Sequence, residues 1–364
     1  MPLCPTIEID LNAVLHNYAC LKKVSPKTQI AAVVKNNAYG LGAREIAGHL
    51  YKKGGCRIFF VAYPFEGAEI RPVAPKADIY VLQGFVPDDT DVYKSQNLIP
   101  VISTPGQWRD WKKTKLNQRP AIQVETGLNR LGFSRAEAEK LTAKERGEFA
   151  LVLTHLACAD EPGDATNQKQ LKNFNAIKGL FPKSKFSIAA SDGYALGKDF
   201  YGDIVRAGAF LYGLNTFKKL KKKQKPVLNI SAAVLQIKEL TPGDSVGYGA
   251  SFTANKKMKI ATISFGYGDG LFRSFSPKGK VWFKGKKGYL PAPVIGRLSM
   301  ESLGCDVSAI PDDVLKEGTR VTLINERYSL DDMGADMNAG LGTIGYETLS
   351  ALCHGIRAVK KYKK

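Results

Sequence analysis

The feature of this sequence that most constrains its fold is a regular alternation, from residue 30 to about 213, between short apolar runs and longer helical stretches. Eight runs are apolar enough to be buried on both faces, as the strands of a parallel sheet are. They are IAAVVK (30–35), RIFFVAY (57–63), DIYVLQG (78–84), IPVIST (99–104), AIQVETG (121–127), ALVLTHL (150–156), FSIAAS (186–191) and IVRAGAFLYG (204–213). Eight such units predict an α/β fold, a (β/α)8 TIM-type barrel.

The stretches between these runs carry helical patterns. AREIAGHLYKKGG (43–55) and SRAEAEKLTAKERG (134–147) are examples, with glycine, serine or aspartate at plausible cap positions. We therefore expect helical segments in both, as a barrel of this kind requires between its strands.

The pattern changes after the lysine-rich run that ends before Pro226. Strand candidates follow at 230–240, 259–270, 280–300 and 320–325, separated by glycine turns rather than long helices. At 364 residues the chain is long enough for two domains. We expect a barrel over 11–228 and a mainly β domain over 229–364, and the amino-terminal strand 1–10 is a candidate to join the second sheet.

The charge of the chain is strongly positive, with a formal net charge of +19 and its densest run at residues 218–225. No nucleic-acid motif accompanies that run, so we expect a solvated surface, attractive to anionic ligands, and no nucleic-acid partner.

No apolar stretch is long enough to span a bilayer, and MPLCPTIEID lacks the features of a signal peptide. We expect a cytoplasmic protein with no membrane partner.

The cysteines and histidines predict no metal centre. The six cysteines are far apart, with no C-x-x-C pair and no metal-ligand spacing with the four histidines. Reduced thiols are the simplest interpretation.

Lys35 is the first candidate for chemistry. It ends the first apolar run and is followed by NNAYG, which places its amine at the carboxyl-terminal mouth of the predicted barrel, where barrel enzymes keep their active sites. A lysine there can form a Schiff base with an aldehyde cofactor once partial burial lowers its pKa. Taken alone, Lys35 is also compatible with an ordinary strand-end lysine in solvent.

The neighbours of Lys35 favour the chemical interpretation. VVKNNAYGLG (33–42) resembles the signature of alanine racemases, which are fold type III pyridoxal-phosphate enzymes. Seven further segments resemble the same family in order: ETGLNRLGF (125–133), THLACADE (154–161), VRAGAFLYG (205–213), GYGAS (247–251), GYGDG (266–270), GRLSM (296–300) and TIGYE (343–347). The resemblance implies interconversion of L- and D-alanine, with pyridoxal 5'-phosphate on Lys35 and D-alanine supplied as a cell-wall precursor.

The resemblance also implies how the cofactor is held. Arg206 faces the pyridine nitrogen, and because an arginine does not readily give up a proton, the nitrogen stays largely unprotonated. This favours simple reprotonation at Cα over other reactions. His155 stacks on the cofactor ring. The phosphate cradle comprises Tyr39, Ser191, Gly208 and Ala209, where small residues let backbone amides approach an anion.

Racemisation needs two bases on opposite faces of one carbon, and a single lysine reaches only one face. The family supplies the second base as a tyrosine from the partner subunit, which here is Tyr248, so we expect a homodimer with shared active sites. A phenol is a poor base unless neighbouring cations lower its pKa, and His155 with Arg206 is the expected relay. Substrate binding falls to Arg130, beside the substrate carboxylate, and to the backbone N–H of Met300.

Two positions depart from the family pattern. Gln123 stands where many members carry a carbamylated lysine that orients the arginine, although its amide oxygen can accept a hydrogen bond from Arg130. His354 stands where the family has a tyrosine that contacts the phosphate and narrows the substrate entrance. Histidine can still donate to a phosphate, so we count His354 among the cofactor-binding residues and leave substrate breadth open.

Several other functions remain to be separated from alanine racemisation. His354 keeps open a racemase of broader specificity, for serine, lysine or arginine. A decarboxylase on a related barrel lacks support because no cysteine motif of that group is present. A cofactor-carrying binding protein without turnover is less favoured because the β domain carries Tyr248 and Met300. Cell-wall precursor supply and alanine catabolism both fit.

Overall fold

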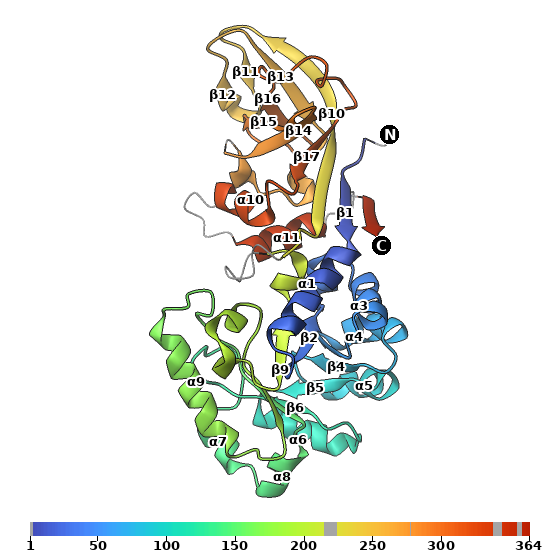
Figure 1. The fold of residues 1–364 in the computed structure, drawn as a ribbon, viewed down its shortest axis with the longest axis vertical. Helices are drawn as coiled ribbons and strands as arrows, with labels where there is room; N and C mark the ends of the chain where they lie inside the picture. Colours follow the sequence, from blue (N-terminus) through green and yellow to red (C-terminus); the bar gives the residue numbers. More distant parts are fainter. Residues whose placement is uncertain (1–2, 215–223, 277, 338–343, 355–358) are drawn as a thin grey trace. The chain divides into compact units, whose positions relative to one another are not determined.

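The computed structural model describes residues 3–214, 224–276, 278–337, 344–354 and 359–364 (Figure 1). The chain forms two compact units, one of Met1–Asn12 with Pro226–Lys364 and the other of Ala13–Lys225. Each unit has its own eight-stranded sheet.

Parallel strands form the sheet of the Ala13–Lys225 unit, in the order β8-β7-β6-β5-β4-β3-β2-β9. A parallel bridge between Ala190 and Arg206 and an antiparallel bridge between Ser187 and Gly202 link its two ends, so the sheet curls round on itself. Its strands are β2 (Gln29–Val33), β3 (Ile58–Val61), β4 (Asp78–Val81), β5 (Ile99–Ile102), β6 (Ala121–Gln123), β7 (Leu151–Leu153), β8 (Lys185–Ser187) and β9 (Ile204–Ala207). Each overlaps one of the eight apolar runs, and the expected (β/α)8 barrel is confirmed.

Helices come before and between the strands of this unit. They are α1 (Leu11–Val24), α2 (Lys35–Tyr39), α3 (Ala43–Lys53), α4 (Pro64–Ile70), α5 (Thr90–Gln96), α6 (Pro105–Thr114), α7 (Arg135–Lys140), α8 (Ala143–Glu148) and α9 (Ala165–Lys178). The helical stretch at 134–147 is two helices rather than one. Ser134 and Thr142 each cap a helix, with Glu137 and Glu145 completing two capping boxes in succession.

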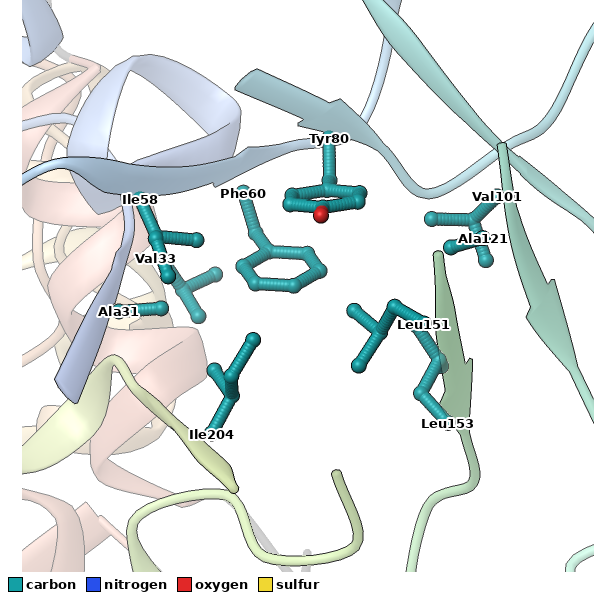
Figure 2. Packing of buried hydrophobic residues seen from close by; sticks show 10 residues of the cluster. All are labelled: Ala31, Val33, Ile58, Phe60, Tyr80, Val101, Ala121, Leu151, Leu153 and Ile204. Atoms are coloured by element: carbon teal, nitrogen blue, oxygen red, sulfur yellow. The ribbon is translucent and has the colours of Figure 1, made fainter. Parts of the chain in front are cut away.

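The barrel interior is filled by side chains, as in other barrels of eight strands. Phe60 and Tyr80 stack there with ring centroids 4.9 Å apart (Figure 2). The buried residues of this cluster are Ala31, Val33, Ile58, Phe60, Tyr80, Val101, Ala121, Leu151, Leu153 and Ile204. The barrel is therefore a packed core, and polar chemistry is confined to the ends of its strands.

The other unit is built mainly of antiparallel strands, in the order β13-β16-β15-β14-β17-β10-β1-β18. A further pairing of β13 with β10 closes six of them into a ring, which the long β10 permits by shifting register between Val234 and Gln236. The strands are β1 (Thr6–Asp10), β10 (Leu228–Leu240), β11 (Ser245–Val246), β12 (Phe252–Thr253), β13 (Met258–Ile263), β14 (Lys280–Gly285), β15 (Gly288–Ile295), β16 (Leu303–Asp306), β17 (Arg320–Ile324) and β18 (Val359–Lys363). The amino-terminal strand β1 pairs with β10 and β18.

Two helices accompany this β sheet, α10 (Leu330–Met337) and α11 (Gly345–Cys353), which the strand-and-turn pattern did not indicate. Most of the lysine run, residues 218–223, lies outside the described residues. Across the part of the chain that the structure describes, no helix is long and apolar enough to cross a membrane.

Candidate active site

Lys35 lies two residues beyond the end of β2 and begins α2, which is not an ordinary helix. The four residues after it, Asn36, Asn37, Ala38 and Tyr39, have φ angles of 54°, 51°, 52° and 58°. These angles describe a left-handed turn, a conformation that costs roughly 1–2 kcal/mol per residue for L-amino acids. Such strain persists only where the surroundings fix the backbone.

Hydrogen bonds from neighbouring helices hold this turn. The N–H of Asn36 donates to the carboxylate of Glu66, near the start of α4. The side-chain oxygen of Asn37 accepts from the N–H of Ala43, at the start of α3, at 2.7 Å. Within the turn, the N–H of Gly40 donates to the carbonyl of Asn36 at 2.8 Å. Lys35 is therefore mounted on a strained but well-anchored segment.

The environment of Lys35 favours its unprotonated amine. Burial lowers the pKa of Lys35 below its usual 10.5, and the positive charges of Arg130 and Arg206 lower it further. The negative charge of Glu66 acts in the opposite direction. A lysine with a lowered pKa is both a better nucleophile and a better proton acceptor near neutral pH.

Arg206 is buried at the end of β9, and its two terminal nitrogens are fully engaged. Nη1 donates to the hydroxyl of Ser187 at 2.6 Å and to its carbonyl at 3.0 Å. Nη2 donates to the carbonyl of Thr154 at 2.6 Å. Burial lowers the pKa of Arg206 to about 10, so the guanidinium remains a cation at neutral pH. Among the described residues no acceptor faces Nε, which leaves this donor for a ligand atom.

His155 lies beside Arg206, with 3.4 Å between its Nδ1 and Nη2 of the arginine. Burial lowers the pKa of His155 from 6.5 to about 3, and nearby cations add to the effect. These cations are Arg206, Arg130 and Lys35. His155 is therefore neutral at pH 7, so in the expected relay only Arg206 supplies positive charge.

The residues expected to hold the phosphate lie together. The hydroxyl oxygen of Ser191 accepts from the N–H of Gly208 at 3.1 Å and from that of Phe210 at 3.2 Å. The N–H of Ala209, between them, has no acceptor among the residues described. A Cβ on Gly208 would lie 2.6 Å from the hydroxyl of Tyr39, so these two residues touch. Burial and the charge of Asp192 raise the pKa of Tyr39, which keeps its phenol protonated as a donor.

Arg130 is exposed and accounts for part of the positive charge felt by Lys35 and His155. The hydrogen bond anticipated from Arg130 to Gln123 is absent between these two described residues. Instead, Gln123 is buried and its side-chain nitrogen donates to the carbonyl of Leu131 at 2.9 Å. Gln123 therefore binds the backbone of the loop next to Arg130 and does not bind the guanidinium of Arg130.

The remaining candidates belong to the other unit. Tyr248 lies on the loop between β11 and β12 and is 68% exposed. Gly247 has a φ of 79°, and a Cβ there would lie 2.7 Å from the backbone nitrogen of Arg297, so only glycine suits the position. Met300 is 50% exposed, and its carbonyl accepts from the N–H of Gly268 at 2.9 Å. The GYGAS and GYGDG segments thus each pack against the GRLSM segment.

His354 caps the carboxyl end of α11 and is exposed. Its Nδ1 lies 2.6 Å from the carbonyl of Ser350. A carbonyl can only accept, so Nδ1 carries the proton and Nε2 is left for other partners. Thr343, the first residue of the TIGYE segment, lies outside the described residues.

Comparison with known families accounts for nearly the whole chain. The model described as "Alanine racemase, N-terminal domain" matches residues 9–216, and "Alanine racemase, C-terminal domain" matches residues 227–360. This chain belongs to the alanine racemase family.

Individual proteins that resemble this chain support the same family assignment. The alanine racemase of Brucella canis is 39% identical over 368 residues, covering 95% of this chain and 91% of that protein. The catabolic alanine racemase of Agrobacterium fabrum is 38% identical over 355 residues, covering 95% and 89%. A crystal structure of alanine racemase from Bartonella henselae with covalently bound pyridoxal phosphate has a TM-score of 0.90 and 36% identity, with 100% of both chains covered.

The barrel of this alanine racemase family member fits pyridoxal phosphate on three observations. Lys35 has a lowered pKa, as a covalent link to an aldehyde requires. The buried Arg206 offers Nε to an acceptor such as a ring nitrogen. The N–H of Ala209, which has no acceptor among the described residues, lies beside Ser191 and Tyr39, where an anion can accept it.

Two residues of the racemase barrel were not found by sequence reasoning. Glu66 lies within a helical stretch and carries no motif, yet it is buried and binds the turn after Lys35. Gln170, on α9, is completely buried and binds the backbone of His155 and Ala157. Only their burial distinguishes them from exposed neighbours such as Glu69 and Gln168, and an amphipathic pattern does not reveal it for polar residues.

Proposed function

We propose that this chain interconverts L-alanine and D-alanine with pyridoxal 5'-phosphate, using Lys35 and Tyr248 of the partner subunit as its two bases. The observation that carries the proposal is the lysine of lowered pKa at the end of a barrel strand, in a chain that matches both alanine racemase domains. When bound, pyridoxal phosphate withdraws electrons from Cα and so makes its hydrogen acidic.

One set of barrel residues would bind the phosphate of the cofactor, and another set would bind its ring. Tyr39, Ser191, Gly208 and Ala209 would hold the phosphate through hydroxyl and backbone donors. Arg206 would bind the ring nitrogen through Nε without giving up a proton, and His155 would lie against the ring. His354 is proposed as a further phosphate contact in place of the tyrosine of other family members, and it would donate through Nε2 when both ring nitrogens carry a proton, because Nδ1 faces the carbonyl of Ser350.

The protein groups then move protons at one carbon. Arg130 would bind the substrate carboxylate, and the backbone N–H of Met300 would contact it from the partner. Lys35 would remove or return the proton on one face of Cα, and the phenol of Tyr248 would do so on the other. Arg206 would supply the positive charge for this second proton transfer, because His155 is neutral.

A homodimer follows from this proposal, because the two bases lie on different units of the fold and the second is assigned to the partner subunit. We also propose a cytoplasmic location and a role in D-alanine biosynthesis for the cell wall. Sedimentation, cell fractionation and D-alanine dependence of a deletion strain test these three statements in turn.

The test of the activity uses purified protein loaded with pyridoxal phosphate. We expect racemisation of both alanine enantiomers, followed by circular dichroism or with a D-amino-acid oxidase. Lys35→Ala should abolish turnover and the visible absorbance band of the lysine-bound cofactor. Retention of that band in Lys35→Ala would refute the assignment of Lys35.

The broader-specificity alternative is not favoured, because the relatives described above are named alanine racemases. Turnover of serine, lysine and arginine at rates comparable to alanine would restore it. Release of carbon dioxide would indicate a decarboxylase instead.

A further inference from the structure

Glu66 is a buried carboxylate outside the residues assigned to the reaction. Its residue is 5% exposed, and among the described residues it forms no ion pair. One oxygen accepts from the N–H groups of Ala62 and Tyr63, at 2.6 and 3.1 Å. The other accepts from the N–H of Asn36. All three partners are donors, which suits an ionised carboxylate because it can only accept.

The two sets of bonds connect separate parts of the barrel. Ala62 and Tyr63 follow β3, and Glu66 closes the first turn of α4 on them as a helix cap does. Asn36 follows Lys35 and is the first of the four left-handed residues. A cap alone would need only the first oxygen, so the second is used to fix the turn that carries Lys35 and Tyr39.

The charge of Glu66 has a second effect on Lys35. Within the described part of the chain, the charged groups that act on the Lys35 amine are Arg130, Arg206 and Glu66, and only Glu66 is negative. The neighbouring His155 is neutral at pH 7. Burial and two arginines all favour the neutral amine, whereas a residue that both takes and returns a proton must hold it for part of the cycle.

We propose that Glu66 is a positioning residue for Lys35, which holds the left-handed turn through the Asn36 N–H and balances the two arginines with its negative charge. The proposal deepens the function given above and rests on it. It predicts two separable consequences, one for the geometry of the site and one for the charge on Lys35.

The test compares Glu66→Gln, which keeps the shape but loses the charge, with Glu66→Asp, which keeps the charge but is one methylene shorter. Glu69→Gln is the matched control, because Glu69 lies one turn further along α4 and is exposed. The apoproteins are mixed with pyridoxal phosphate over a range of pH. Absorbance gives both the dissociation constant and the pH midpoint of covalent capture by Lys35, which requires the unprotonated amine.

We expect both Glu66 variants to bind pyridoxal phosphate about tenfold more weakly, as the loss of a hydrogen bond to a charged group implies. The capture midpoint should move to lower pH in Glu66→Gln, since the arginines then act unopposed. It should stay near the wild-type value in Glu66→Asp and in Glu69→Gln. A role limited to capping α4 would leave the midpoint unchanged.

The proposal is overturned if Glu66→Gln has the affinity and midpoint of Glu69→Gln. If Glu66→Gln does not fold, as judged by circular dichroism of the apoprotein, Glu66→Asp decides, and wild-type affinity in that variant overturns the positioning role. Capture of the cofactor is measured without substrate, so these results are independent of whether the wild-type protein racemises alanine.

Discussion

Gln170→Met tests whether a single buried amide organises the loop that carries His155. Gln170 is completely buried on α9 and makes three hydrogen bonds. Its oxygen accepts from the N–H of Ala157 at 2.8 Å, and its nitrogen donates to the carbonyl of His155 at 3.0 Å and to the hydroxyl of Thr126 at 3.1 Å. Methionine has a similar length and none of these donors or acceptors.

The expected cost follows from the groups that lose a partner. A buried neutral donor or acceptor without a partner costs about 1–3 kcal/mol. The hydroxyl of Thr126 keeps a partner, because it lies 2.8 Å from that of Thr154. The two backbone groups, on His155 and Ala157, therefore account for about 2–6 kcal/mol. At about 2–4 °C per kcal/mol for a domain of this size, the melting temperature should fall by roughly 4–24 °C.

The assay is thermal and urea unfolding of the apoprotein, with Gln168→Met as the control. Gln168 lies two residues earlier on α9 but is exposed, so its replacement should change stability by no more than about 0.5 kcal/mol. The reasoning is refuted if Gln170→Met and Gln168→Met unfold at the same urea concentration. A loss confined to catalysis, with stability unchanged, would equally contradict it.

Three further predictions concern the site itself. Tyr248→Phe should slow removal of the α-hydrogen from one alanine enantiomer far more than from the other, as measured by deuterium exchange from each. Gly208→Ala should weaken pyridoxal phosphate binding about tenfold, because its Cβ would lie 2.6 Å from the hydroxyl of Tyr39 and displace it. His155 has a folded pKa of about 3 against 6.5 when unfolded, so the unfolded chain binds the extra proton. Stability should therefore fall as pH drops from 6.5 towards 3, and less so in His155→Gln.

Each of these has an outcome that contradicts it. Equal slowing of both enantiomers would exclude Tyr248 as a base specific to one face. Gly179→Ala is the control for Gly208→Ala, because a Cβ there meets nothing within 4 Å, and equal affinities in the two variants would exclude the clash. Parallel stability curves for His155→Gln and the wild type would mean that His155 does not titrate differently on folding.

The barrel could be predicted from the sequence because its strands are short, apolar and separated by helical stretches. Residues 134–147 show the limit of this reasoning, since periodicity continues through Leu141 while two capping boxes divide the segment. Helices α10 and α11 were missed because glycine turns and strands dominate the pattern around them. Each capping box joins residues only three apart, so the signal that divides residues 134–147 is local, and apolar periodicity alone does not detect it.

The candidate site also has features that could be predicted from the sequence and features that could not. Lys35, Arg206 and the phosphate residues could be chosen because they end strands and match the family's segments. The left-handed turn at 36–39 could not, because alanine and tyrosine rarely adopt positive φ angles and Glu66 is needed to hold the turn. The neutrality of His155 likewise depends on three cations brought near it by folding.

The pairing of β1 has a consequence for synthesis on the ribosome. Ile9 pairs with Leu228 and also with Tyr362, so the first strand has no partner until most of the chain has been translated. At roughly 5–20 residues per second, this delay is on the order of ten seconds or more. The nascent chain therefore carries an unpaired apolar strand throughout translation of the barrel, a period in which chaperone binding would protect it from aggregation.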